Sequence, residues 1–168
     1  GRIGAIRMRP MSLYKSEESN GRVSLKSLFE GKDFEVQENS LTIDDIAFLV
    51  CRGGWPASIS MRREIALDQA LDYIDSVANY DIQRVDGTKR DPQRVYRLLR
   101  SYARNIAGQI SYSTFKTDMM SNDTDTLSED TVADYIKALK RLFVIEDLEA
   151  WNPNLRSKAA IRTSDTRY

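Results

Sequence analysis

The chain has 168 residues, of which 41% are hydrophobic and 30% are charged, and its 25 basic residues balance its 25 acidic ones. This composition is typical of a globular protein with a buried core, and the zero net charge excludes a global attraction to nucleic acid or to a membrane surface. Histidine does not occur in the chain, which excludes Ser-His-Asp and Cys-His catalysis and the common zinc sites.

The sequence also lacks both common phosphate-binding glycine motifs, G-x-x-x-x-G-K-[ST] and G-x-G-x-x-G. Its longest apolar run is far shorter than the roughly 20 residues that cross a bilayer, so we expect no membrane contact. Cys51, the only cysteine, lies in the apolar run 46–51, and we expect it to be buried in a protein of a reducing, cytoplasmic compartment. Gly1 is not an initiator methionine and no signal-peptide core follows it, so the chain looks like the interior of a longer protein.

The N-terminal segment is predicted to contain a strand, a loop and a short helix. Residues 3–9 alternate between the two sides of an extended chain before Pro10, which predicts a short strand. Residues 14–22 are polar and predict a loop, and residues 24–30 predict a short helix that Gly31 ends.

Two long helices are predicted next. Thr42 can cap the first of them, and acidic residues in its first turn suit the helix dipole. Its apolar residues recur at helical spacing and predict a buried face that consists of Ile43, Ile46, Ala47 and Val50. The second helix is expected to run from about Ser60 to Val85, with a break around Asn79.

The corner Arg52-Gly53-Gly54-Trp55-Pro56 joins these two helices. Its glycines permit positive φ and the close approach of another surface, and its proline fixes φ and stops the first helix. Two interpretations stay open. In the first, the corner is a helix–helix turn with Trp55 in the core. In the second, it is a surface that presses against a flat ligand such as a purine ring, and both interpretations can hold at once.

Three helices and two strands are predicted in the remainder: helices over 91–108, 113–120 and 128–142, and strands over 144–151 and 161–163. Pro92 begins the first of these helices, and Ser128 caps the third. Their order is typical of a winged helix-turn-helix. The predicted fold class is therefore mainly α, with a helical lid, a winged helix-turn-helix with a small β wing, and a short N-terminal strand.

Charged residues on the last helices suggest interaction surfaces. At 100° per residue, one face of the helix over 91–108 is basic and consists of Arg90, Arg94, Arg97, Arg100 and Arg104. This face is a track for phosphates, a dock for an acidic neighbouring domain, or a solvated face, and docking is preferred over DNA.

The helix over 128–142 occupies the place of a recognition helix. Glu129 and Asp130 in its first turn would repel phosphates by roughly 1 kcal/mol each. The wing is a better nucleic-acid candidate, with the basic residues Arg156, Lys158 and Arg162.

Several stretches together resemble a large group of bacterial and archaeal P-loop proteins, in which an AAA-like ATPase core precedes a C-terminal domain of unknown function. Gly1-Arg2-Ile3 through Arg9-Pro10-Met11-Ser12-Leu13 resembles the strand that leaves that core. The corner at 52–56 is similar to the group's G-G-x-P, and the helices over 91–108 and 128–142 look like its winged-helix segment.

The resemblance implies that the chain is a middle fragment. Residues 1–31 would be the tail end of the ATPase core, 32–90 the helical lid and 91–168 the winged-helix domain. The missing core and a nuclease-like C-terminal domain would be its partners, and exposed docking faces would allow a homodimer. The fragment itself would bind no cofactor and perform no catalysis, whereas ATP and Mg²⁺ are expected in the intact parent.

Gly54-Trp55-Pro56 is also similar to the G-x-P of signal-transducing ATPases with several domains, whose proline packs against adenine from the helical lid. The resemblance implies that Gly54, Trp55 and Pro56 contact the nucleotide in the intact parent, with Arg2 near the γ-phosphate. The expected function is the coupling of nucleotide state to a C-terminal domain. The alternative is a DNA-binding winged-helix module.

Overall fold

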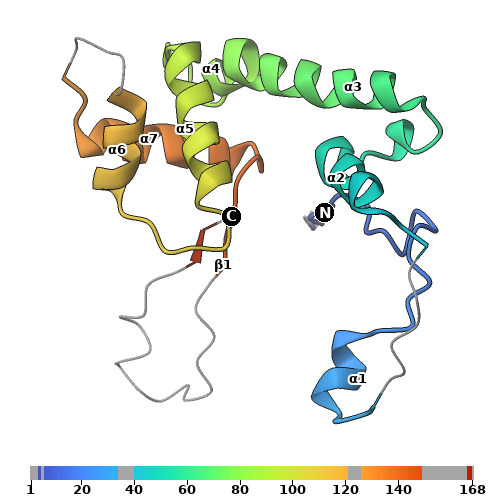
Figure 1. Ribbon diagram of the computed structural model, residues 1–168. Helices are drawn as coiled ribbons and strands as arrows, with labels where there is room; N and C mark the ends of the chain where they lie inside the picture. The colour runs from blue at the N-terminus through green and yellow to red at the C-terminus, as the bar shows by residue number, and fades with distance from the viewer. Residues whose placement is uncertain (1–3, 5, 34–39, 121–125, 149–165, 168) are drawn as a thin grey trace. The chain divides into compact units, whose positions relative to one another are not determined.

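The computed structural model describes most of the chain (Figure 1), in the stretches 4, 6–33, 40–120, 126–148 and 166–167. The chain divides into two compact units, Gly1–Ile74 and Asp75–Tyr168. The described residues of both units are mainly helical, which confirms the fold class at that level.

The first unit contains α1 (Leu25–Phe29), α2 (Ile43–Arg52), the 3-10 helix η1 (Pro56–Ser58) and the greater part of α3 (Arg63–Ser76). Local side chains start its helices. Ser24 caps α1, and α2 begins with a capping box in which Thr42 and Asp45 satisfy each other's backbone N–H groups. The helices predicted over 24–30 and from Thr42 onward are confirmed.

The strand predicted over residues 3–9 is wrong for its described part, because Gly4 and residues 6–9 form no strand. Alternation can place side chains on both sides of an extended chain, but a stable strand also needs a hydrogen-bonded neighbour. Ile6 and Met8 are exposed, so the described part of the unit does not cover this segment.

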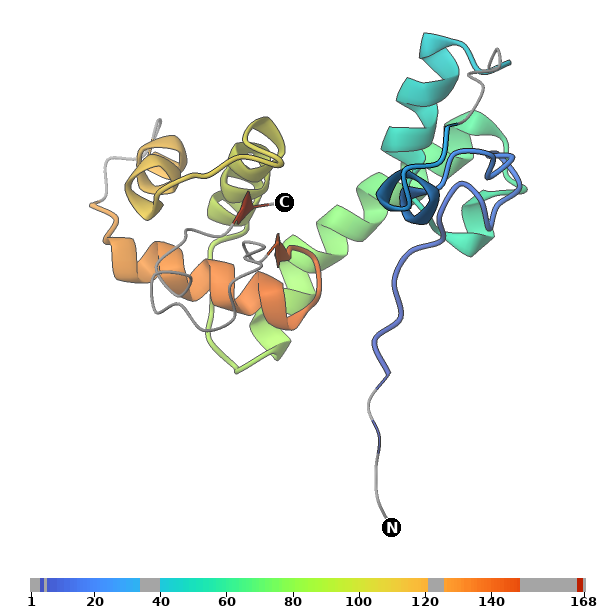
Figure 2. The same cartoon turned by 90° about the horizontal axis from the view of Figure 1, so that it is seen from below.

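The second unit is built on α5 (Pro92–Arg104), α6 (Tyr112–Met120) and α7 (Glu129–Arg141), which the π-helical turn η2 (Val77–Asp81) and α4 (Ile82–Arg84) precede. Helix α5 packs against α6, and α6 packs against α7 (Figure 1, Figure 2). These helices confirm the three predicted after residue 90. The π-helical turn contains Asn79, where the sequence predicted a break.

The core of the second unit is formed by the inner faces of these helices. Its members include Val95, Leu98 and Tyr102 of α5, Phe115 and Met119 of α6, and Val132, Ile136 and Leu139 of α7. The rings of Tyr102 and Phe115 are stacked with centroids 4.5 Å apart, which adds a directional contact to simple burial. Burial at helical spacing explains why these helices were predictable.

A short antiparallel pair completes the described part of the second unit. Strand β1 (Asp147–Leu148) pairs with β2 (Thr166–Arg167). Strand β1 lies within the strand predicted over 144–151. The strand predicted over 161–163 lies outside the described residues.

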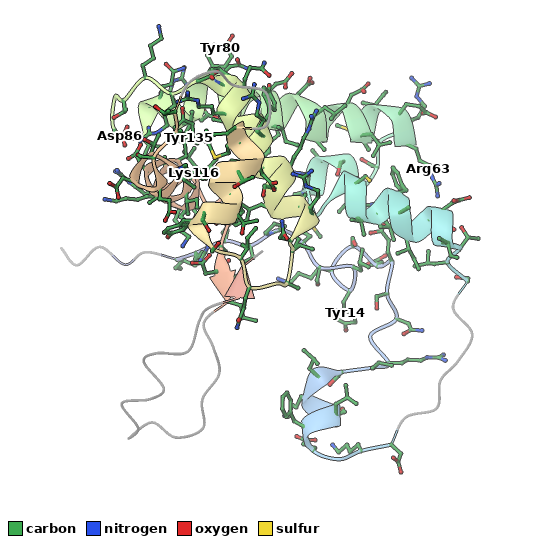
Figure 3. The ribbon with its side chains drawn as sticks, turned by 60° about the vertical axis from the view of Figure 1, so that its left-hand side comes forward. Tyr14, Arg63, Tyr80, Asp86, Lys116 and Tyr135 are labelled. Atoms are coloured by element: carbon green, nitrogen blue, oxygen red, sulfur yellow. The ribbon has the colours of Figure 1, made fainter. Side chains whose placement is uncertain are left out.

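A buried arginine ties the start of α5 to its neighbours. Arg90 is 3% exposed, and its guanidinium donates to the carboxylates of Asp86 and Asp134 and to the carbonyl oxygen of Ile82. The guanidinium carbon of Arg90 also lies 6.0 Å from the ring centroid of Tyr135, which is labelled in Figure 3 together with Asp86. Hydrogen bonds from Arg90 hold the pKa of Asp86 well below its ordinary value.

The basic face predicted on α5 serves contacts within the unit. Besides the buried Arg90, Arg97 donates to the Met119 carbonyl oxygen at 3.0 Å, and Arg104 pairs with Asp118 at 3.0 Å. Because α6 packs along α5, these arginines join the two helices. The structure therefore does not support a continuous free track for phosphates.

We expect Arg90→Met to lower the free energy of unfolding of the second unit by about 2 kcal/mol, a value typical of a hydrogen bond that involves a charged group. The Ile82 carbonyl oxygen would lose a donor, and Asp86 and Asp134 would lose their shared cation. Amide hydrogen exchange in α5 and α7 measures the loss. Arg100→Met, at an exposed position of α5, is the control and should stay within about 0.5 kcal/mol; equal effects of the two variants would contradict the assignment.

The start of α2 is expected to weaken in acid. Hydrogen bonds from the backbone and hydroxyl of Thr42, and then from Arg63, lower the pKa of Asp45 from 3.8 to about 2. A lowered pKa in the folded state means that the ionised carboxylate stabilises folding, so this contribution is present above 3.8 and is lost as the pH falls through about 2. NMR titration of the Asp45 carboxyl carbon checks the midpoint. Thr42→Ala should raise it, whereas Ser24→Ala, which removes the cap of α1, should leave it unchanged.

Candidate functional site at the Arg52–Pro56 corner

The corner begins where α2 ends. Gly53 adopts a φ of 71°, which favours glycine, and its N–H donates to the Leu49 carbonyl oxygen at 3.1 Å. Trp55 then precedes η1, and Pro56 occupies the first helical position, where its missing N–H leaves no bond unmade. The corner is therefore a helix–helix turn, as one interpretation of the sequence predicted.

Arg52 anchors the N-terminal loop to the corner. Its side chain is 3% exposed, and its guanidinium donates to the two carboxylate oxygens of Glu18 at 2.5 and 2.7 Å. Its Nε donates to the Gly53 carbonyl oxygen at 3.2 Å. Bidentate pairs of this kind are among the stronger hydrogen-bonded contacts in proteins, and this pair lowers the pKa of Glu18.

Gly54 lets the backbone of Pro10 and Met11 approach the corner closely. The Met11 N–H donates to the Gly54 carbonyl oxygen at 2.9 Å. A Cβ atom on Gly54 would lie 2.4 Å from the Met11 carbonyl oxygen and 2.9 Å from the Pro10 Cβ. A larger residue at this position must therefore displace the segment.

Trp55 and Pro56 lie at the surface of the unit. Trp55 is 38% exposed, and its ring packs against Tyr73 of α3 with centroids 4.7 Å apart and planes at 57°. Pro56 is exposed as well. The helix–helix turn is confirmed, but the part of that interpretation that placed Trp55 in the core is wrong. An indole held by one neighbour and accessible beside a proline offers planar apolar contact.

Helix α2 turns its predicted core face toward solvent. Ile43, Ile46 and Val50 are 85%, 48% and 75% exposed, whereas Leu49 is buried. Cys51, which was expected to be buried, is exposed too. Periodicity shows which residues share a face of a helix, but it does not show which neighbour covers that face.

An apolar groove of about 360 Å³ lies beside this face. Met11 and Leu13 line it together with Ile46, Leu49 and Val50, and both corner glycines reach it. We call the combination of this groove with the exposed side chains Ile43, Ile46 and Val50 the α2 surface. It extends to the corner that carries Trp55.

The structure brings the predicted residues Gly54, Trp55 and Pro56 together at the corner. The other predicted site residues, Arg2, Arg156, Lys158 and Arg162, lie outside the described residues.

Sequence reasoning missed the partners that hold the corner, which are Glu18, Met11 and Tyr73. Glu18 lies in the polar stretch 14–22, which has no periodicity to mark it. Its ion pair joins positions 34 residues apart, so only the folded chain reveals it.

The corner supplies planar apolar contact and no free cation, because Glu18 already engages Arg52. The described residues contain no group of three or more His, Cys, Asp or Glu side chains suited to hold a metal ion. None of the helices in the described part of the chain has the length and apolar character needed to cross a membrane.

Comparison with known proteins places the chain in a family. A family model described as a domain of unknown function, DUF8612, matches residues 43–168, and the chain belongs to this family. The match begins at the first residue of α2 and includes the corner. No curated protein and no solved structure matches the chain significantly.

We expect Gly54→Ala to release residues 10–18 from the corner, because the new methyl group would collide with the Met11 backbone. Amide exchange at Met11 should accelerate about tenfold or more, which corresponds to roughly 1.4 kcal/mol. Gly4→Ala is the matched control, since a Cβ there meets no atom within 4 Å. Unchanged exchange at Met11 in Gly54→Ala would show that the close approach is not needed.

Proposed function

We propose that this chain is the non-catalytic lid and winged-helix part of a P-loop ATP-binding protein, and that it couples the nucleotide state of an AAA-like core to a C-terminal domain. The segment that includes α2, the corner and α3 serves as the lid. The second unit serves as the winged helix. ATP and Mg²⁺ are bound by the core, and the protein acts in the cytoplasm.

The exposure of the α2 surface carries this proposal. Soluble domains rarely leave contiguous large apolar side chains in water unless another surface covers them. Full burial of a side chain such as Ile or Val is worth about 1.5–3 kcal/mol, so docking of Ile43, Ile46 and Val50 would be favourable. The resemblance of the corner to a lid motif points to the AAA-like core as the partner.

Trp55 and Pro56 would form the adenine side of the nucleotide site. Both are accessible, and Tyr73 fixes the indole by ring contact. Pro56 has no N–H to desolvate, and Gly54, which lets the Met11 backbone approach, holds the N-terminal segment beside the contact. Phosphate and metal contacts would come from the core, with Arg2 near the γ-phosphate.

Helix α3 supports the coupling role, because it begins at Arg63 in the first unit and ends at Ser76 in the second. The π-helical turn η2 follows it directly. Such turns frequently occur at functional sites. The lid and the second unit are therefore joined by one helix, through which the coupling would act.

DNA binding is the second candidate function. The order of α5, α6 and α7 followed by an antiparallel strand pair favours it, and Arg156, Lys158 and Arg162 would supply the basic wing. Glu129 and Asp130 are exposed at the start of α7, where a recognition helix meets the bases. Their charge favours the coupling role over DNA.

The test uses the full-length protein encoded by the reading frame that contains this chain. We expect a phosphate loop upstream of Gly1, and we expect Pro56→Ala and Trp55→Ala each to raise the Kd for ATP about tenfold, equivalent to roughly 1.4 kcal/mol. Binding of inorganic triphosphate, which lacks adenine, should not change. Calorimetry measures both affinities.

Tyr80→Ala is the control for this experiment, because it removes another exposed aromatic side chain. Pro56→Ala leaves the packing of Trp55 against Tyr73 in place, so it separates ligand contact from stability. The proposal would be wrong if the reading frame encodes no phosphate loop, or if the Kd for ATP is the same in Pro56→Ala, Trp55→Ala and the wild type.

A further inference from the structure

One face of α7 carries a self-complementary strip of charge. Glu129, Ala133, Lys137 and Arg141 follow one another at intervals of four residues, which places them along the same side of the helix. Asp130 lies beside Glu129 on this side. The strip is therefore acidic at its N-terminal end, small in its middle and basic at its C-terminal end.

The four charged ends of this strip are exposed, and they form no ion pair within the part of the chain that the structure describes: Glu129, Asp130, Lys137 and Arg141. Their neighbours on the helix differ, since Asp134 pairs with Arg90 and Lys140 pairs with Asp147. Acids at the start and bases at the end also suit the helix dipole. The helix dipole explains the order of the charges along α7, but it does not explain the apolar hollow beside the basic end.

That surface is a hollow of about 540 Å³ at the basic end of the strip. Tyr112, Ile136 and Phe143 give it an apolar lining, and Lys137 and Arg141 stand at it. Because most of the lining is apolar while basic residues flank it, the hollow suits a partner that brings both apolar and acidic groups.

Phe143 is held there in a strained conformation. The Phe143 N–H donates to the Lys140 carbonyl oxygen at 3.0 Å, and the Val144 N–H donates to the Leu139 carbonyl oxygen at 3.1 Å. These two bonds form a Schellman motif with Phe143 at the position where glycine is usual. Its φ is 58° and its side chain is 69% exposed, so a strained backbone presents an aromatic ring at the surface.

We propose that this strip is an interface with a second copy of the same chain, in which the two α7 helices pack antiparallel about a two-fold axis. Glu129 and Asp130 of one copy then face Arg141 and Lys137 of the second copy, and the same pairs form again across the axis. The small side chain of Ala133 permits close approach at the centre. The hollow of each copy receives the acidic first turn of the other.

A second copy fits the strip better than other partners. Nucleic acid would satisfy Lys137 and Arg141, but its phosphates would meet Glu129 and Asp130 on the same side of the helix. An acidic peptide would leave those two acids unpaired. Antiparallel pairing with an identical strip satisfies both signs of charge, and this inference does not depend on the nucleotide role proposed above.

The test measures association of the full 168-residue chain by sedimentation velocity from about 1 µM to 1 mM, where weak interfaces dissociate. We expect the wild type to dimerise, and added salt to weaken the dimer. Glu129→Lys with Asp130→Lys, and separately Lys137→Glu with Arg141→Glu, should each weaken association about tenfold or more, because like charges then face each other.

Mixing the two charge-reversed variants should restore a dimer, because the acidic strip of one then meets the basic strip of the other. Arg100→Glu, at an exposed position on α5, is the matched control and should associate like the wild type. Phe143→Gly should raise the melting temperature, since glycine relaxes the positive φ, and yet weaken the dimer. Three results would overturn the proposal: a wild-type chain that stays monomeric at about 1 mM, charge-reversed variants that dimerise normally, or a mixture that remains monomeric.

Discussion

The first unit depends on the ion pair between the buried side chain of Arg52 and the partly exposed side chain of Glu18. Few of its apolar side chains face inward, and Leu49 and Ala66 are its buried apolar residues among those described. Hydrophobic burial alone therefore gives little to hold residues 10–18 in place. The bidentate pair supplies the missing constraint, and the close contact between Gly54 and Met11 depends on the same folding back of the chain.

The second unit follows a different balance of forces. Its helices bury a continuous set of large side chains, so hydrophobic packing dominates. Arg90 is buried in this unit as well, but its role is to fix the start of α5 against α7 through Asp134 and to satisfy the Ile82 carbonyl oxygen. Loss of Arg90 would thus weaken one contact between α5 and α7 in a unit that hydrophobic packing still holds together. Loss of Arg52 would remove the main contact that holds residues 10–18 in the first unit.

The same contrast appears in the exposure of α2. The first unit has few buried apolar side chains, and α2 exposes most of the apolar residues that helical spacing aligns. The α2 surface and the corner are adjacent, because both corner glycines line the groove. The DUF8612 family model matches residues 43–168, which include α2, the corner and the second unit.

Local chemistry made much of the fold predictable from the sequence. Caps such as Thr42 and Ser128 and the helical spacing of apolar residues act over a few positions, so α2, α5, α6 and α7 were expected where they occur. The corner itself was identified because glycine, tryptophan and proline have strong local preferences. Asn79 marked the interruption that the structure shows as a π-helical turn.

Only the tertiary structure decided which faces are covered and which charges are paired. Helical spacing aligned Ile43, Ile46 and Val50, yet it could not show that the described unit leaves them exposed. Arg90 and Arg52 look like surface residues in the sequence, and they are buried because their carboxylate partners arrive from other parts of the chain. The sequence by itself determined the helices and the corner, because those follow from neighbouring residues. The tertiary structure determined the contacts of the corner with Glu18 and Met11 and the exposure of the α2 surface, because those depend on residues that are distant in the sequence.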